Sequence, residues 1–295
     1  MMLRLCKSFK LKVMNKRIHL FLLLPLLIIS CRKEKSLEGG DPNPIWVGTN
    51  CRVSQVLTVD SATSFGFEAH NAFFDSKGLA TGTELYDSLT NSTIFRTNYF
   101  YKGDTAYVNN GQYFVQDKTT GRVKEFKGLE DPTDPFSDTI KIKFTYNATG
   151  QLTAKDYYFF NLPVPALRST YTYTNGNLTK MLFVSLFPTS EIIADAILDY
   201  NTNQPVKEFM YIFPDGYLIT PYILSFNFGT RPANTIKKMN TRFYSSGAVT
   251  DSLVTNYKNY VLSRDNYVLD LFAEGDYQDA VGNIFERTKF QYKCR

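Results

Sequence analysis

The stretch Tyr146-Asn-Ala-Thr-Gly-Gln-Leu152 has the composition of a tight β-hairpin turn. A tyrosine ends one run of alternating residues, the polar residues favour a turn, Gly150 can adopt a positive φ, and Leu152 opens the next run. The same order of residue types returns at Tyr173-Thr-Asn-Gly-Asn-Leu178. Each stretch therefore predicts two antiparallel strands joined by a short turn.

Weaker copies of this turn occur along the chain. They lie at Tyr200–Val206 and, more loosely, at Tyr107–Tyr113, Phe213–Leu218 and Tyr244–Val249. Tyr146, Tyr173 and Tyr200 are spaced 27 residues apart, a period that indicates a structural repeat. A single hairpin cannot bury its apolar face, whereas several stacked hairpins can.

From about Trp46 onward, short runs of β-branched and aromatic residues are separated by Asn, Asp, Gly and Pro, a pattern typical of strands and turns. The one helix candidate, Glu191–Leu198, fits a strand equally well. We therefore predict an all-β domain over 47–295, an antiparallel meander of hairpin repeats that forms a twisted open sheet or a partly closed barrel. The predicted strands include 51–59, 92–101, 139–146, 169–174, 207–213, 222–228, 266–272 and 287–294.

The N-terminal residues have the features of a secretory signal. An apolar run of about ten residues, Leu20–Ile29, follows the basic stretch Met14–His19 and is shorter than the ~20 residues that a spanning helix needs. Translation from Met14 would give a signal of ordinary size, with 1–13 as an extension. The alternative is an uncleaved signal anchor.

The run ends at Ile28-Ile29-Ser30-Cys31, which resembles the lipobox of bacterial lipoproteins. The resemblance implies cleavage after residue 30, diacylglycerol on the Cys31 sulfur and acylation of the new amino group. The acyl chains would anchor the protein to a membrane. Residues 31–46 would then form a flexible tether, and the protein would lie at the bacterial outer membrane, facing the periplasm or the cell surface.

Removal of residues 1–30 changes the charge of the chain. The full chain has a formal net charge of +5, but residues 1–30 contain six basic residues and no acidic ones. The remainder holds 27 basic and 28 acidic residues. This balance gives no electrostatic basis for binding nucleic acid, and we expect no nucleic-acid partner.

Three cysteines follow the predicted cleavage site: Cys31, Cys51 and Cys294. If lipid occupies Cys31, one pair remains in an oxidising compartment, which predicts a Cys51–Cys294 disulfide between the first and last strands. The alternative is two buried free thiols. These cysteines and the single remaining histidine, His70, form no ligand cluster, so we expect no metal and no cofactor.

The hairpin stretch Tyr146–Leu152 resembles a YD repeat, whose unit reads Tyr-Asp-x-x-Gly-Arg-Leu, with Asn147 in place of Asp. Gly121-Arg122-Val123 keeps the glycine–arginine part of that unit. The chain is also similar to uncharacterised lipoproteins of Bacteroidota, which combine a lipobox, a charged tether, YD-like hairpins and a terminal strand like 290–295. Some of these are described as porin-like meander folds. The resemblance implies an architecture but no activity.

Other candidate sites have two readings each. Asp-Ser/Thr-aliphatic triplets resemble the O-glycosylation motif of Bacteroidota exported proteins, or they end turns before strands. The acidic loop at 128–138 could bind calcium or be a rigid solvated loop. The aromatic residues could line a groove for an apolar ligand or pack across strands. The four triplets would place glycans on Ser61, Ser88, Thr139 and Ser252.

The sequence contains no nucleophile elbow and no nucleotide-binding loop, and His70 would have to serve any Ser–His–acid arrangement. We therefore predict a non-enzymatic envelope lipoprotein that binds an apolar or glycan ligand or a protein partner. The alternatives are an envelope hydrolase that acts on glycan or lipid through unidentified carboxylates, and a repeat scaffold for adhesion.

Overall fold

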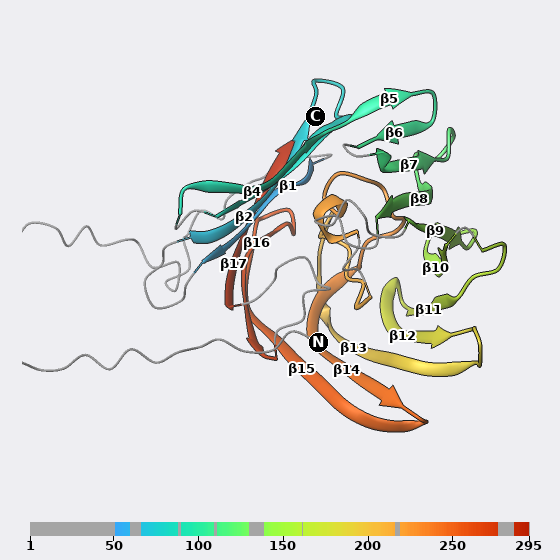
Figure 1. Ribbon diagram of the computed structural model, residues 1–295. Helices are drawn as coiled ribbons and strands as arrows, with labels where there is room; N and C mark the ends of the chain where they lie inside the picture. Colours follow the sequence, from blue (N-terminus) through green and yellow to red (C-terminus); the bar gives the residue numbers. More distant parts are fainter. Residues whose placement is uncertain are drawn as a thin grey trace, which may run out of the picture. The chain divides into compact units, whose positions relative to one another are not determined.

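The computed structural model describes residues 51–59, 66–87, 90–108, 111–129, 139–160, 162–215, 219–276 and 286–294, which belong to the compact unit Pro44–Arg295. These residues form 17 strands and one short 3-10 helix (Figure 1). None of the described residues form a helix that is long and apolar enough to cross a membrane. The elements are β1 Cys51–Val59, β2 Gly66–Phe74, β3 Ala80–Asp87, β4 Ser92–Asn98, β5 Phe100–Lys102, β6 Thr105–Tyr107, β7 Tyr113–Gln116, β8 Val123–Leu129, β9 Thr139–Tyr146, β10 Leu152–Phe159, β11 Leu167–Thr174, β12 Asn177–Ser185, β13 Glu191–Pro205, η2 Thr220–Tyr222, β14 Asn234–Ser245, β15 Ala248–Leu262, β16 Val268–Gly275 and β17 Glu286–Cys294.

The strands form one antiparallel meander that closes nearly into a barrel. Each strand pairs with its neighbours in the chain, and β1 pairs with both β2 and β17, so the first and last strands meet. The exception is β4 and β5, which follow one another through Tyr99; β3 pairs with β4, and β6 pairs with β5. The predicted all-β meander and its partly closed barrel are confirmed.

The two turns that best predicted the fold are hairpin turns. Gly150 has a φ of +84°, and the Asn147 N–H donates to the Gln151 carbonyl over 3.0 Å between β9 and β10. Between β11 and β12, Asn175 and Gly176 have φ values of +51° and +80°. Two positive φ values in a two-residue loop match the twist of the strands on either side.

The weaker turn predictions divide into correct and incorrect ones. The stretches at 107–113 and 244–249 connect paired strands, β6 to β7 and β14 to β15. The prediction at Tyr200–Val206 is wrong, because β13 continues to Pro205. This copy has Gln204 where the others have glycine, so it lacks the residue that turns most easily. Gly216–Leu218 lie outside the described residues, and Glu191–Leu198 belong to β13.

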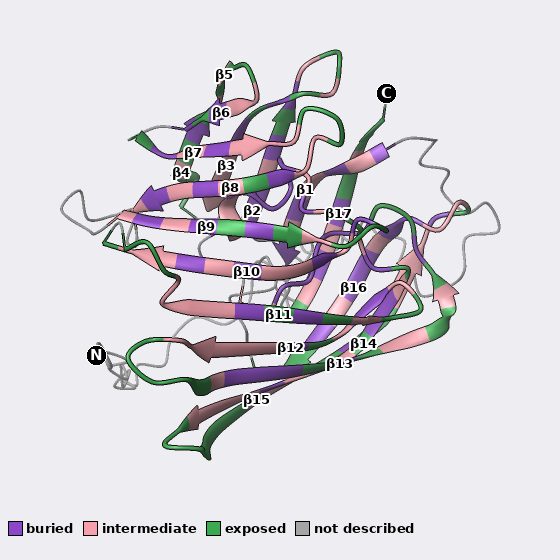
Figure 2. Cartoon of the chain, turned by 90° about the vertical axis from the view of Figure 1, so that its right-hand side faces the viewer, coloured by how far each residue is buried: buried purple, intermediate pink, exposed green. Residues whose placement is uncertain are grey.

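The wall of the barrel is apolar inside and polar outside. In β9 the inward residues Ile140, Ile142 and Phe144 are buried, whereas Lys143 and Thr145, which point outward, are exposed. The same alternation of burial runs along several neighbouring strands (Figure 2). A pore-forming barrel has the opposite polarity, with an apolar outer band and a polar lumen.

The connection between β13 and β14, residues 206–233, fills the interior, and we call it the plug. Figure 1 shows it inside the ring of strands. Eleven of its described apolar and aromatic side chains are almost fully buried: Phe209, Met210, Tyr211, Ile212, Phe213, Ile219, Tyr222, Ile223, Leu224, Phe226 and Phe228. The ring of Phe226 stacks on that of Phe114 in β7 at 4.2 Å. The aromatic residues therefore pack as core side chains.

Two predicted strands, 207–213 and 222–228, are wrong because both lie in the plug and belong to no strand. Consecutive residues of 209–213 are buried, so this segment has no exposed face. A segment that wall strands surround is buried on every side and needs no alternation of polar and apolar residues.

Candidate functional site at the disulfide end of the barrel

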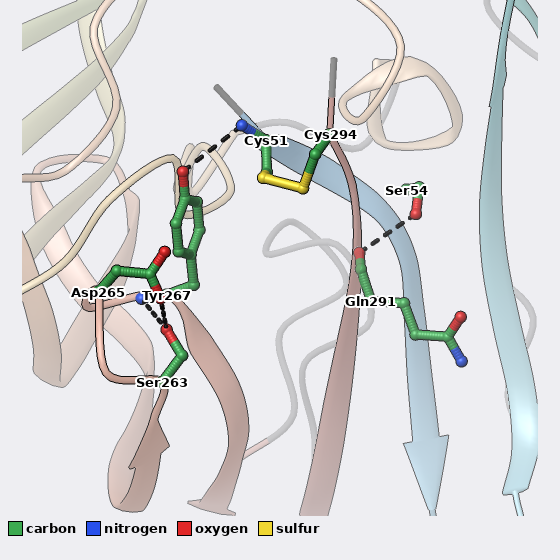
Figure 3. The surroundings of a disulfide bond; sticks show 7 residues. All are labelled: Cys51, Ser54, Ser263, Asp265, Tyr267, Gln291 and Cys294. Carbon is green, nitrogen blue, oxygen red and sulfur yellow. Dashed lines mark hydrogen bonds between the residues drawn. A yellow bond between two sulfur atoms is a disulfide. The ribbon is translucent and has the colours of Figure 1, made fainter. Parts of the chain in front are cut away.

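A disulfide joins the two ends of the meander, as predicted. Cys51 begins β1 and Cys294 ends β17, and the two residues are directly opposite in the register. Their Cα atoms lie 3.9 Å apart, and the bond spans 243 residues of sequence (Figure 3). We call this end of the barrel the mouth.

The turn between β15 and β16 is held against the disulfide. The Cys51 N–H donates to the Tyr267 hydroxyl over 3.4 Å, and the Tyr267 N–H donates to the Ser263 hydroxyl over 2.9 Å (Figure 3). The Ser263 hydroxyl in turn donates to Asp265 over 2.7 Å. These contacts hold the turn, with Tyr267 and Asp265, against Cys51.

A hollow of about 800 Å³ lies at the mouth, and we call it the mouth hollow. Its volume is in the range of small-molecule binding sites. The plug and the ends of the neighbouring strands line it. Its charged and aromatic lining consists of Arg52, Lys207, Glu208, Tyr211, Phe226, Arg231, Asp265 and Tyr267. Three cationic and two acidic side chains give it a local excess of positive charge.

Arg231 is held in the mouth hollow by two neighbours. Its guanidinium forms an ion pair with Glu208 and lies 4.7 Å from the ring centroid of Tyr211. The Arg231 Nε is buried and has no hydrogen-bond partner among the described residues. Arg231 thus lines the hollow with a guanidinium that Glu208 and Tyr211 hold in place, and guanidinium groups match carboxylate and phosphate oxygens.

Arg52 lies between two hollows. It follows Cys51 in β1, and its guanidinium lies 5.0 Å from the ring centroid of Phe74. A second hollow of about 310 Å³ shares Arg52, Phe226 and Asn227 with the mouth hollow. The disulfide and the stacked ring restrict where this cation can lie.

Asp215 attaches the plug to the wall. Its carboxylate accepts hydrogen bonds from the Lys155 ammonium at 3.2 Å, the Tyr157 hydroxyl at 2.8 Å, the Tyr171 hydroxyl at 2.6 Å and the Ser169 hydroxyl. Four donors match the roughly four lone-pair positions of a carboxylate. The Lys155 and Asp215 side chains are only 1% and 5% exposed, so this group is a structural anchor with no open face.

The pKa values in this anchor follow from burial and pairing. Burial alone would raise the pKa of Asp215, but Lys155 and the hydroxyls of Ser169, Tyr171 and Tyr157 outweigh it and lower that pKa below its usual value. Burial lowers the pKa of Lys155, and the interaction with Asp215 opposes this shift. Asp215 is therefore held as a carboxylate by the wall.

His70 also connects wall and plug, and its side-chain partners among the described residues are Thr83 and the Pro221 carbonyl. Its Nε2 donates to the Pro221 carbonyl over 2.9 Å, and the Thr83 hydroxyl donates to the same oxygen over 2.9 Å. Burial lowers the pKa of His70 from 6.5 to about 4, although the hydrogen bond to Pro221 acts in the opposite direction. His70 is therefore neutral at neutral pH.

Only two of the remaining predicted residues, Thr139 and Ser252, are among the described ones. Cys31, Ser61, Ser88 and the acidic loop 130–138 lie outside the described residues. Thr139 is the first residue of β9 and is half-buried, and Ser252 is exposed in β15. No group of three or more His, Cys, Asp or Glu side chains within the described ranges is placed to hold a metal ion.

Sequence reasoning missed Arg52, Arg231 and Asp215. The one signal concerned Asp215: the run 209–213 lacks alternation and is followed by Pro214-Asp215-Gly216. A polar turn after an all-apolar run, between strands whose residues alternate, indicates a segment enclosed by the sheet.

Comparisons with known proteins identify the fold. No protein-family model matches the chain, and no curated protein matches it. Among solved structures it is similar to a porin-like protein from Bacteroides uniformis, with a TM-score of 0.51, 14% identity, and coverage of 82% of this chain and 96% of that chain. A porin-like protein from Bacteroides vulgatus gives a TM-score of 0.48 and 13% identity over 83% of this chain and 99% of that one. At this identity the first likeness shows the fold alone.

Proposed function

We propose that this chain is a lipid-anchored bacterial envelope protein whose barrel binds a small anionic ligand in the mouth hollow. The observation that carries the proposal is the hollow of about 800 Å³ with Arg52, Lys207 and Arg231 in its lining. A carboxylated sugar fits this chemistry, because guanidinium groups pair with carboxylates and the hollow has room for a monosaccharide.

The envelope location rests on the N-terminal sequence. The signal-like run, the lipobox-like Ile28–Cys31 and the polar tether support lipidation of Cys31 and a place at the outer membrane. The disulfide is in keeping with export to an oxidising compartment. The fold shared with the Bacteroides uniformis protein agrees with this assignment.

A binding role accounts for the mouth better than hydrolysis does. Glu208 and Asp265 both line the hollow, but Arg231 pairs with the first and Ser263 donates to the second. A glycosidase needs one carboxyl group free to give a proton and one free to act as base or nucleophile. The Asp215 group is titratable, but it is enclosed and its acceptor positions are filled.

The test is calorimetric titration of the full chain in detergent with D-galacturonate, inorganic phosphate and D-glucose. We expect saturable binding of galacturonate and a smaller or undetectable signal with glucose. Arg231→Gln should weaken galacturonate binding about tenfold, because it removes a charged donor group. Arg52→Gln should weaken it similarly.

Arg96→Gln is the matched control. Arg96 also pairs with a glutamate, Glu84, and lies 5.5 Å from the centroid of an aromatic ring, that of Phe73, but it is outside the hollow. Binding should be unchanged in this variant. Equal weakening in the Arg96 and Arg231 variants, or no binding of either anion to the wild-type chain, would refute the assignment of the ligand site.

Lipidation and glycosylation need a separate measurement on protein from the native host. The intact mass should correspond to a chain that begins at Cys31 and carries three acyl groups, and Cys31→Ser should abolish that addition. Further mass in units of sugars, lost in Thr139→Val or Ser252→Ala, would support glycans at these positions. A mass that equals the lipidated polypeptide alone would exclude the glycans.

A further inference from the structure

An outward-facing row of side chains crosses consecutive strands of the wall. Its members are directly opposite one another in the register: Phe100 with Tyr107, Tyr107 with Tyr113, Tyr113 with Lys127, Lys127 with Lys141, and Lys141 with Tyr158. The row thus runs from β5 to β10, and Figure 2 shows β7, β8, β9 and β10 side by side. Neighbouring strands are about 4.8 Å apart, so the row is roughly 24 Å long.

The aromatic end of the row is open to solvent. Phe100 is 69% exposed and Tyr107 is 39% exposed. The ring centroids of Phe100 and Tyr107 are 6.5 Å apart, and those of Tyr107 and Tyr113 are 6.2 Å apart. Three adjacent rings on an outer face expose apolar surface to water, which is unfavourable, and they contribute little to the core. They therefore indicate a surface that a partner covers.

The other end of the row is cationic. Lys141 lies 4.8 Å from the ring centroid of Tyr158, and Lys143 of the adjacent row lies 5.1 Å from it. No described carboxylate forms an ion pair with Lys127, Lys141 or Lys143. These lysines are therefore available to an anionic partner.

Two carboxylates lie beside the row, and both have partners. Asp156 is held by the Arg168 guanidinium at 2.6 Å and 3.2 Å. Glu125 accepts a hydrogen bond from the Tyr113 hydroxyl at 3.3 Å. Both carboxylates are opposite Lys143 in the register, and the four described cations Lys127, Lys141, Lys143 and Arg168 outnumber them, so the described charges leave a net positive strip.

We propose that the row from Phe100 to Tyr158 is a binding platform for an acidic polysaccharide chain. The three rings would contact the apolar faces of successive sugars, and the lysines would pair with carboxylates further along the polymer. The length of the row fits an extended chain better than a single sugar. Single-stranded nucleic acid is the competing polyanion, because its bases would also stack on the rings, and the test below includes it. The platform is on the outer wall and is independent of the mouth hollow.

The test is affinity electrophoresis of the full chain in native gels that contain polygalacturonate, single-stranded DNA, neutral dextran or no polymer. We expect retardation by polygalacturonate alone, with loss of retardation as salt is raised. The double variant Phe100→Ala/Tyr107→Ala should weaken the apparent affinity about tenfold or more, and Lys127→Gln/Lys141→Gln should weaken it and reduce its salt dependence.

Two controls make the result decisive. Lys180→Gln removes an exposed lysine of β12, outside the row, and should leave retardation unchanged. Arg231→Gln should also leave it unchanged, so that failure of the mouth proposal and of this one can be told apart. Because the replaced side chains are exposed or half-exposed, all variants should keep the far-UV spectrum of the wild type.

Several outcomes would overturn the platform. They are no retardation by polygalacturonate, equal retardation by dextran, stronger binding of single-stranded DNA than of the polysaccharide, or loss of retardation in the Arg231 variant but not in the row variants. Each of these results would show that the row does not bind an acidic polysaccharide.

Discussion

The wall and the plug bury similar side chains, but their sequence patterns differ. In β9, inward Ile140, Ile142 and Phe144 alternate with polar residues, because one face of the strand meets water. In the plug, consecutive residues of 209–213 are all buried, because the wall encloses them. Strand pairing holds the wall together, whereas side-chain anchors such as Asp215 hold the plug in place. The comparison teaches that an apolar run without alternation, in a chain of alternating strands, indicates an enclosed segment.

Substitution of Asp215 is expected to have the largest effect, and it tests whether a buried side-chain anchor holds the plug in the wall. Asp215→Ala leaves the buried Lys155 ammonium and three hydroxyls without their acceptor, and we expect the free energy of unfolding to fall by about 3–5 kcal/mol. Guanidinium chloride unfolding of the full chain at neutral pH measures this change.

The matched control is Asp156→Ala on the outer wall. Asp156 pairs with Arg168, whose side chain is 43% exposed, so its loss should cost less than about 1 kcal/mol. If the two variants lose the same small amount of stability, the plug is not anchored by a buried charge.

The disulfide tests whether wall and plug share one cooperative core. The double variant Cys51→Ser/Cys294→Ser should lose about 2–5 kcal/mol, because the bond restricts a loop of 243 residues in the unfolded chain. Unfolding should remain a single transition by tyrosine fluorescence and far-UV circular dichroism. Two separate transitions would show that the plug leaves before the wall opens. The wild-type chain under reducing conditions should match the variant.

Local signals explain how much of the fold the sequence can predict. Gly150 and Gly176 mark turns by a conformation that few other residues adopt, and alternation marks the strands between them. The Cys51–Cys294 pairing followed from a count of cysteines in an oxidising setting. These features depend on short stretches or simple counting, and the meander follows from them.

The plug and the mouth could not be predicted in the same way. Residues 207–213 have strand-forming composition, and only their enclosure by distant strands keeps them out of the sheet. Arg231 and Arg52 meet at the mouth because the plug returns to the place where the chain's first and last strands join. Asp215 looked like an ordinary turn residue, since its partners Lys155 and Ser169 are more than forty positions away. Long-range packing, rather than local propensity, creates the candidate site.

His70 lies in the wall and donates a hydrogen bond to the plug, so the pH dependence of stability tests the contact between the two regions. The unfolded chain takes up a proton on His70 below about pH 6.5, but the folded protein does so only at about pH 4. The free energy of unfolding should therefore fall by about 3 kcal/mol as the pH decreases from 6.5 to 4, and the contribution should level off below that.

His70→Gln is the control for this pH dependence. Glutamine keeps a donor for the Pro221 carbonyl but does not titrate, so the fall between pH 6.5 and 4 should shrink by about that amount. Asp215, whose pKa is below its usual value, weakens the fold only at still lower pH. Parallel pH profiles for the variant and the wild type would contradict the buried, neutral state of His70.

The smallest expected effect concerns one hydrogen bond between plug and wall. The Tyr222 hydroxyl in the plug donates to the buried Gln112 side chain over 2.8 Å. Tyr222→Phe leaves that amide oxygen without its donor and should cost about 1–2 kcal/mol in chemical unfolding. Tyr107→Phe is the matched control, because the exposed Tyr107 side chain can exchange its hydroxyl bonds with water, and its cost should lie within about 0.5 kcal/mol of zero. If both substitutions are neutral, water reaches Gln112 and the plug is packed more loosely against the wall than the strands are against one another. If only Tyr222→Phe is costly, the plug is part of the same close-packed interior, because an unsatisfied amide is expensive only where solvent cannot replace the lost donor.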